Sequence, residues 1–149
     1  MTTSPDHPDP GAAAPEHPGE RPLQRPVPVG ALPPDGVLLA LSTVASREQA
    51  EPIARALIEE RLAACVSLVP GCLSVYRWQG EVEQADEVLL LIKTTRNRYA
   101  ALEKRLLELH PYELPELVAL APDRMLRAYA GWVIGETRQR FVRREGPAS

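Results

Sequence analysis

Apolar runs and amphipathic stretches alternate along the middle of the chain. Residues 36–45 read GVLLALSTVA, a short apolar run that predicts a buried strand. The next stretch, SREQAEPIARALIEERLAA, has apolar side chains at helical spacing, and Ser46 and Gln49 have the spacing of a capping box. Pro52 lies about two turns into this helix, so either it kinks the helix or the regular part begins near Glu51.

Two long strands with a tight connection are predicted next. Residues 65–78 alternate as a strand does, and residues 81–95 return as its partner. Pro70 and Gly71 interrupt the first arm and require a bulge or a bend at a sheet edge. Gly80 can take the left-handed conformation of a bulged hairpin loop. The sequence therefore predicts a hairpin with a bend in its first arm.

The remaining pattern completes a known element order. Residues 96–110 form a second amphipathic helix that Pro111 stops, residues 116–121 a short strand, and residues 123–142 a last helix. Strand, helix, hairpin, helix, strand is the order of the ferredoxin-like βαββαβ sandwich. We therefore predict an α+β fold, an antiparallel sheet with two helices on one face, with an extended hairpin and an added C-terminal helix.

The hairpin is too long for the helices that cover it. Each arm of about 13 residues reaches roughly 40 Å, whereas the second helix covers only about half of that length. The outer half carries Val75, Tyr76, Trp78 and Val82, and aromatic side chains are enriched in interface cores. A long uncovered edge of this kind favours pairing with another copy of the chain, so we predict a homo-oligomer. The alternative is an exposed, flexible hairpin tip.

Composition separates the ends of the chain from this domain. The sequence has 149 residues, and ten of its 16 prolines precede Gly36. Residues 1–35 cannot build a core, so we predict a disordered, partly polyproline arm. The folded domain is expected to span residues 36–143, followed by a disordered tail at 144–149.

Charge and cysteine usage favour a cytoplasmic protein. The formal net charge is −3 and no long basic block is present, which does not suggest a nucleic-acid partner. No secretory signal and no apolar run of membrane-spanning length are present, so no membrane partner is expected. Cys65 and Cys72 are separated by roughly 20 Å in extended chain, so they should remain reduced thiols.

Three sequence blocks resemble the CutA family of divalent-cation tolerance proteins. They are ERLAACVSLVPG, SVYRWQGEVEQADEVLLLIKTT and HPYELPELVAL, and the resemblance runs from about Val37 to Trp132. It implies a ferredoxin-like subunit and a tight homotrimer in which long bent hairpins pair between subunits. It also implies a cytoplasmic protein that binds copper(II) or another divalent cation and has no established catalytic activity.

Imidazole and thiolate are the ligands that copper and zinc prefer, so His110, Cys65 and Cys72 are considered as metal ligands. His110 matches the histidine of the family motif, but it can equally close the second helix. Cys65 matches the cysteine of LAAC, but it sits in an apolar run, where a free cysteine usually packs as a small buried hydrophobic residue. These residues do not make a closed four-ligand site in one chain, so a metal would need ligands from neighbouring subunits, carboxylates or water.

One departure from the family concerns a cysteine that some members carry in the first strand. This sequence has Ser42 at that position, so a copper site that uses the cysteine cannot exist here. His7 and His17 in the N-terminal arm could bind copper weakly without functional meaning.

The segment HPYELPE places a phenol and carboxylates between two prolines. The resemblance implies that they belong to a polar cleft between subunits, to which Lys93 could bring a cation. The residues proposed for this cleft are Trp78, Glu87, Lys93, Tyr112, Glu113 and Glu116. The same groups are equally compatible with a salt-bridge network that fixes the trimer.

Two functions remain in competition on the sequence alone. The first is a trimeric metal-binding and metal-homeostasis protein, and the second is a trimeric signalling module, similar in architecture to PII-like regulators, that binds a small molecule in its intersubunit clefts. An enzyme of acylphosphatase type would need an anion-binding loop with a basic residue, and an RNA-recognition domain would need an aromatic-rich central strand. Neither motif is present, so no enzymatic activity is expected.

Overall fold

The computed structural model describes residues 36–139. The predicted Pro-rich arm, the predicted tail and the last residues of the predicted domain lie outside the described residues. The elements are β1 (Val37–Val44), α1 (Arg47–Glu59), β2 (Cys65–Trp78), β3 (Glu81–Thr95), α2 (Arg96–Leu109), β4 (Val118–Leu120) and α3 (Arg127–Glu136).

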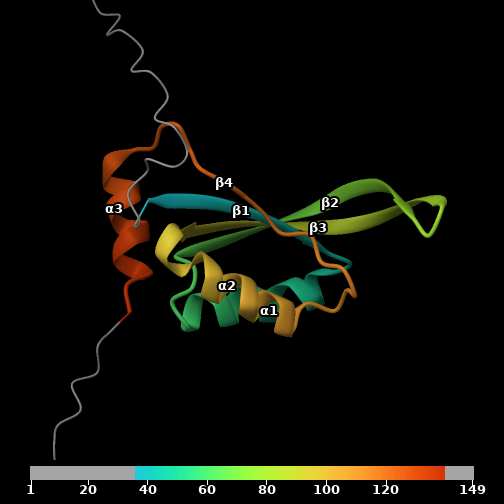
Figure 1. Ribbon diagram of the computed structural model, residues 1–149, viewed down its shortest axis with the longest axis horizontal. Helices are drawn as coiled ribbons and strands as arrows, with labels where there is room; N and C mark the ends of the chain where they lie inside the picture. Colours follow the sequence, from blue (N-terminus) through green and yellow to red (C-terminus); the bar gives the residue numbers. More distant parts are fainter. Residues whose placement is uncertain (1–35, 140–149) are drawn as a thin grey trace, which may run out of the picture.

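The strands form one four-stranded sheet in the order β2-β3-β1-β4, and every neighbouring pair is antiparallel. Helices α1 and α2 lie side by side on one face of this sheet, and the β2–β3 hairpin extends past their ends (Figure 1). The predicted α+β class and its strand and helix order are confirmed. Because the hairpin extends past both helices, neither helix covers its outer half.

The first helix begins where its cap residue predicts. The hydroxyl of Ser46 accepts a hydrogen bond from the Gln49 backbone N–H at 3.3 Å, and the Gln49 side chain accepts one from the Ala45 N–H at 3.1 Å. The helix therefore starts at Arg47 and includes Pro52. The alternative prediction, a regular helix that begins near Glu51, is wrong because the capping contacts fix the first turn.

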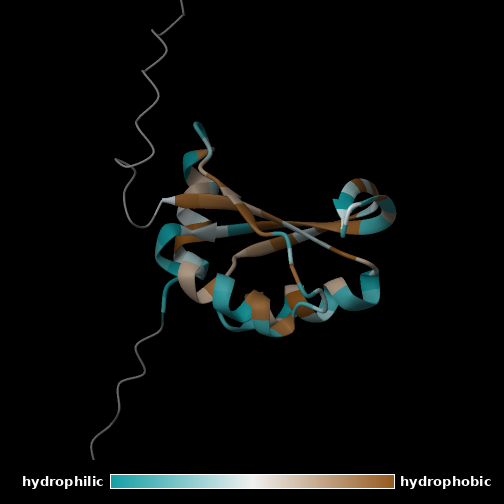
Figure 2. Cartoon of the chain, turned by 45° about the vertical axis from the view of Figure 1, so that its right-hand side comes forward, coloured by the Kyte–Doolittle hydropathy of each residue, from teal (hydrophilic) through white to brown (hydrophobic). Residues whose placement is uncertain are grey.

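The core lies between the sheet and helices α1 and α2. Side chains alternate along the strands, so one face of β1 and β3 turns towards the helices. Figure 2 shows hydrophobic residues along the central strands and a mixture of hydrophobic and hydrophilic residues on the helices. The fully buried apolar side chains of this core include Ala40, Val44, Leu57, Leu90, Ile92, Leu102 and Leu106.

The hairpin has the predicted arms and the predicted bulge. The register shifts between Val69 and Cys72, where Pro70 and Gly71 interrupt the ladder of the edge strand β2. Its connection differs from the prediction, because Trp78 pairs directly with Glu81 and only two residues form the turn. Gln79 and Gly80 have φ values of 49° and 83°, so the turn is of type I′ rather than a bulged loop.

The last strand and helix are shorter than predicted. The β4 strand has three residues, because the chain before it is held to β1 by side-chain contacts rather than by a ladder. Helix α3 ends at Glu136, where the Thr137 hydroxyl donates to the carbonyl of Val133 at 2.9 Å and competes with the helical pattern. Residues 140–142 of the predicted helix lie outside the described residues. No helix within 36–139 has the length and apolar content to cross a membrane.

Candidate functional site

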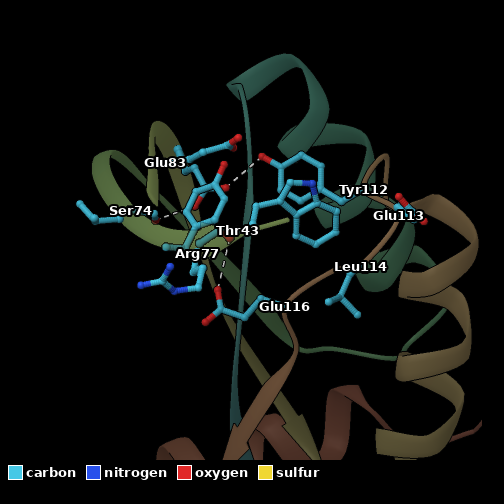
Figure 3. A pocket seen from close by; sticks show the side chains of 12 residues that line it. Thr43, Ser74, Arg77, Glu83, Tyr112, Glu113, Leu114 and Glu116 are labelled. Atoms are coloured by element: carbon cyan, nitrogen blue, oxygen red, sulfur yellow. Dashed lines mark hydrogen bonds between the residues drawn. The ribbon is translucent and has the colours of Figure 1, made fainter. Parts of the chain in front are cut away.

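A cavity of about 680 Å³ lies where the outer half of the hairpin passes the segment between α2 and β4 (Figure 3). Such a volume falls in the range of small-molecule sites, roughly 300–1,000 Å³. The cavity is open on one side and combines aromatic rings with carboxylates. It is lined by Thr43, Ser74, Val75, Tyr76, Arg77, Trp78, Glu83, Glu87, Tyr112, Glu113, Leu114 and Glu116.

Part of the lining comes from the hairpin, because every second side chain of a strand points to the same face. Beyond the bulge, Ser74, Tyr76 and Trp78 point to one face of β2, since successive strand residues point to opposite faces. The residue opposite Tyr76 on β3 is Glu83, so a phenol ring and a carboxylate face the same side. Val75 and Arg77, whose side chains alternate with these, also line the cavity, so alternation accounts for only part of the β2 lining.

Glu87 is the best-fixed carboxylate of the site. It is only 7% exposed, and its two oxygens accept hydrogen bonds from the Ser74 hydroxyl at 2.6 Å and the Tyr112 hydroxyl at 2.9 Å. Burial, reinforced by the bond to Glu87, raises the pKa of Tyr112 to about 12. The phenol is therefore protonated at neutral pH and acts as a donor.

The segment that carries Tyr112 is attached to the end of β1. The Ser42 hydroxyl donates to the Glu116 carbonyl at 2.7 Å, and the Thr43 hydroxyl donates to the Glu116 carboxylate at 3.2 Å. Ser42 is completely buried. In this chain it fastens the cavity wall to the sheet.

His110 is the C-cap residue of α2 and both of its ring nitrogens have protein partners. Its Nε2 lies 2.9 Å from the carbonyl of Thr43, and its Nδ1 accepts from the Tyr112 N–H at 3.1 Å. Since a carbonyl can only accept, Nε2 carries the proton and Nδ1 is the acceptor. The ring is 8% exposed, so a metal could reach His110 only if one of these bonds broke.

Cys65 and Lys93 lie together, away from the cavity. The ammonium of Lys93 donates to the Ser67 hydroxyl at 2.7 Å and lies 3.6 Å from the Cys65 sulfur. Lys93 follows Glu87 by six residues on β3, a distance of roughly 20 Å. The expectation that Lys93 brings a cation to the cavity carboxylates is therefore not met within one chain. Cys65 is half-buried rather than a core residue.

A metal centre is not formed by the described part of a single chain. Residues 36–139 contain no group of three or more histidine, cysteine, aspartate or glutamate side chains that could hold one ion. Cys65 and Cys72 are both free thiols. The described residues of one chain therefore do not fit a bound copper or zinc ion.

Most residues predicted for the cleft between subunits lie around this cavity of one chain, and the cleft itself stays a prediction. Five of the six predicted cleft residues line the cavity, namely Trp78, Glu87, Tyr112, Glu113 and Glu116. The sequence did not lead us to the other seven lining residues, namely Thr43, Ser74, Val75, Tyr76, Arg77, Glu83 and Leu114. Alternation from Trp78 and the register of a two-residue hairpin would have located Ser74, Tyr76 and Glu83, whereas Thr43 depends on tertiary contacts.

Comparison with known proteins gives one consistent family. The family model described as CutA1 divalent ion tolerance protein matches residues 38–136. A divalent-cation tolerance protein CutA from Thermus thermophilus is 53% identical over 95 residues, which cover 64% of this chain and 92% of the relative. Protein CutA from mouse is 41% identical over 100 residues, which cover 67% of this chain but only 56% of the mouse protein.

Solved structures agree with these relatives. The divalent cation tolerance protein Cut A1 from Thermus thermophilus superposes with a TM-score of 0.67 at 50% identity, covering 68% of this chain and 99% of the other. CutA from Xylella fastidiosa gives a TM-score of 0.67 at 45% identity, covering 68% and 98%. The matched region includes the hairpin, the cavity segment and helix α3, and the chain belongs to the CutA family of divalent ion tolerance proteins.

Proposed function

We propose that this protein is a cytoplasmic homotrimer of ferredoxin-like subunits that serves divalent-cation tolerance by binding metal ions rather than by catalysis. Membership of the CutA family over residues 38–136 is the observation that carries this proposal. One feature of the single chain supports the assembly part of the proposal, an exposed apolar surface on the sheet.

The apolar surface lies on the side of the sheet away from α1 and α2. Val69, Val118 and Leu120 are 40%, 45% and 51% exposed, and Leu120 pairs with Leu39 on this face of the sheet. Val69 lies on β2 and the other two on β4, at the two edges of the sheet, and exposed apolar side chains gathered on one face mark interaction sites. A second copy of the chain is the proposed occupant, and the number of three rests on the family resemblance.

Light scattering of the purified chain, with a matched pair of variants, tests the assembly. Leu120→Glu places a charge on the open face of the sheet and should lower the mass to that of a monomer. Leu107→Glu is the control, because Leu107 is similarly exposed at 54% but lies on α2. A monomeric parent protein, or equal dissociation of both variants, would exclude this interface.

The metal-binding part of the proposal predicts that ligands come together only on assembly. Copper(II) titrated calorimetrically into a His7→Gln, His17→Gln chain should bind to the trimer, and Leu120→Glu should weaken the binding at least about tenfold. His110→Asn should bind copper as the parent does, since both ring nitrogens of His110 are already bonded within the chain. Binding that survives in the monomer, or no binding by the trimer, contradicts the proposal. Loss of binding in a folded His110→Asn trimer would identify His110 as a ligand.

A second function, a signalling or interaction module that binds a small molecule as PII-like regulators do, is favoured by the cavity itself. It offers about 680 Å³ and both aromatic and polar groups, which is typical of sites for organic ligands. A thermal-shift screen of metabolites tests this function. A reproducible rise in Tm that Trp78→Ala abolishes would support it, whereas no shift with any compound would count against it.

A further inference from the structure

We propose that the cavity beside the hairpin binds an organic cation, a small molecule that carries an alkylated or primary ammonium group. This inference rests on the small-molecule function proposed above and names its ligand class. It is drawn from the charge, the aromatic rings and the size of the cavity (Figure 3).

The first argument is the charge of the lining. The cavity is lined by four glutamates and one basic residue, Arg77. None of the four carboxylates has a salt-bridge partner among the described residues. Arg77 donates to the carbonyl of Gly80 at 3.3 Å, and in Figure 3 its guanidinium points away from Tyr112 and Leu114. The electrostatic potential in the cavity therefore favours a positive ligand and opposes phosphates and carboxylic acids.

The second argument is the burial of the Glu87 carboxylate. This residue is 93% buried, and its carboxylate oxygens accept hydrogen bonds from the neutral hydroxyls of Ser74 and Tyr112. A buried charge is costly unless a counter-charge or several hydrogen bonds compensate it. Two hydroxyl donors provide part of this compensation, and a ligand cation in the cavity would provide the rest.

The third argument is the combination with aromatic rings. Tyr76, Trp78 and Tyr112 line the same cavity as the carboxylates. The faces of such rings attract ammonium groups, and quaternary ammonium ligands are recognised in this way. Carboxylates alone would suit a bare metal ion, whereas aromatic faces beside carboxylates are the combination that recognises organic ammonium groups.

The fourth argument separates this ligand from a metal ion. Residues 36–139 contain no three acidic, histidine or cysteine side chains close enough to share one ion. The negative charge is instead distributed around a space of about 680 Å³. A large cation with dispersed charge matches that distribution, whereas a divalent metal ion does not.

The test compares a cation with its uncharged isostere. Choline and 3,3-dimethyl-1-butanol have nearly the same shape and differ in the positive charge. A Trp132→Phe chain leaves Trp78 as its one tryptophan, so the fluorescence of Trp78 reports the cavity. We expect choline to change this fluorescence with a dissociation constant at least about tenfold lower than that of the neutral isostere.

Variants that replace a glutamate by glutamine show whether choline binding depends on the charge of Glu87. Glu87→Gln keeps the size and the acceptor oxygen of the side chain, and it should weaken choline binding about tenfold or more. Glu59→Gln, on the exposed end of α1, is the matched control and should bind choline as the parent does. Circular dichroism establishes that both variants are folded.

The remaining outcomes distinguish this inference from the function on which it rests. Equal binding of choline and its neutral isostere, or choline binding that Glu87→Gln does not change, would overturn the cation class while the cavity remains a small-molecule site. Preference for acetate or phosphate over choline would do the same. If choline, its isostere and both anions all leave the Trp78 fluorescence unchanged, the cation inference is rejected, and the metabolite screen alone then decides the small-molecule function.

Discussion

The β2–β3 hairpin has two halves that share one ladder but lie in different surroundings. In the inner half, Leu90 and Ile92 are completely buried against the helix layer. In the outer half, Leu73 and Val82 are 58% and 65% exposed. The ladder hydrogen bonds are the same in kind, so the difference lies in what covers the side chains.

This difference shows which half of the hairpin is needed for the core and which half is free for another role. The inner half supplies the core, and its residues are restricted by packing. The outer half contributes little to that core, so its aromatic and acidic residues are available for a ligand or another subunit. The candidate cavity lies along the outer half, where Ser74 and Glu83 belong to the two arms.

The largest expected effect comes from replacing a leucine by alanine in the inner half of the hairpin, and the same replacement in the outer half serves as the comparison. Leu90→Ala removes a completely buried side chain and should lower the free energy of unfolding by about 2–5 kcal/mol. Leu73→Ala removes a largely exposed one and should change it by only about 0.5 kcal/mol. Urea denaturation at one protein concentration measures both.

Two results would alter the comparison. Equal costs for the two substitutions would show that the outer half is as well buried as the inner half. A cost for Leu73→Ala that depends on protein concentration would instead place Leu73 in the proposed contact between subunits.

A second pair of substitutions compares two serines that each donate one hydrogen bond. Ser42→Ala leaves the Glu116 carbonyl without its hydroxyl donor inside the structure, and we expect a loss of about 1–3 kcal/mol. Ser74→Ala removes a donor from Glu87, which keeps its bond to Tyr112, so about 0.5–1.5 kcal/mol is expected.

Thermal unfolding and amide hydrogen exchange measure the two serine effects. Exchange in residues 111–117 should accelerate in Ser42→Ala, because this serine fastens the segment to β1. Unchanged exchange there would mean that the Thr43 contact and the prolines hold the segment without Ser42.

The sequence predicted the hairpin well because its signals are local. Alternation defines both arms, and Gly80 marks a turn that requires positive φ. The end of α3 was predicted less well, since the competing bonds of the Thr137 hydroxyl are not visible as a break in the apolar pattern. Local periodicity predicts an element better than its boundary.

The cavity was predicted only in part, because its residues are brought together by tertiary contacts rather than by local periodicity. Trp78, Glu87 and Tyr112 were located by resemblance to a family, and the structure places them around one space. Thr43 reaches that space because Glu116 is attached to the end of β1, a contact between residues 73 positions apart. Lys93 lies six residues beyond Glu87 on β3 and does not line the cavity of one chain, so its place in a cleft between subunits stays a prediction.

The last comparison concerns proton binding in the cavity, whose effect on stability changes only above about pH 10. Burial and the bond to Glu87 raise the pKa of Tyr112 to about 12, against about 10 for tyrosine in an unfolded chain. The folded state therefore holds this proton more tightly than the unfolded state does. The resulting stabilisation is fully present below about pH 10 and is lost as the pH rises towards about 12.

A spectrophotometric titration of the phenolate absorbance measures this proton. Tyr112→Phe should remove a component that titrates near pH 12, and it should also flatten the fall of stability between about pH 10 and 12. Tyr99→Phe is the control, because Tyr99 lies on α2 beside Glu103 and does not line the cavity. If Tyr112→Phe removes only a component near pH 10, the phenol is not held by Glu87 in solution. The outer half of the hairpin would then present a looser wall than the contacts of Ser74 and Tyr112 describe, and a preformed site for a cation would lose its main support.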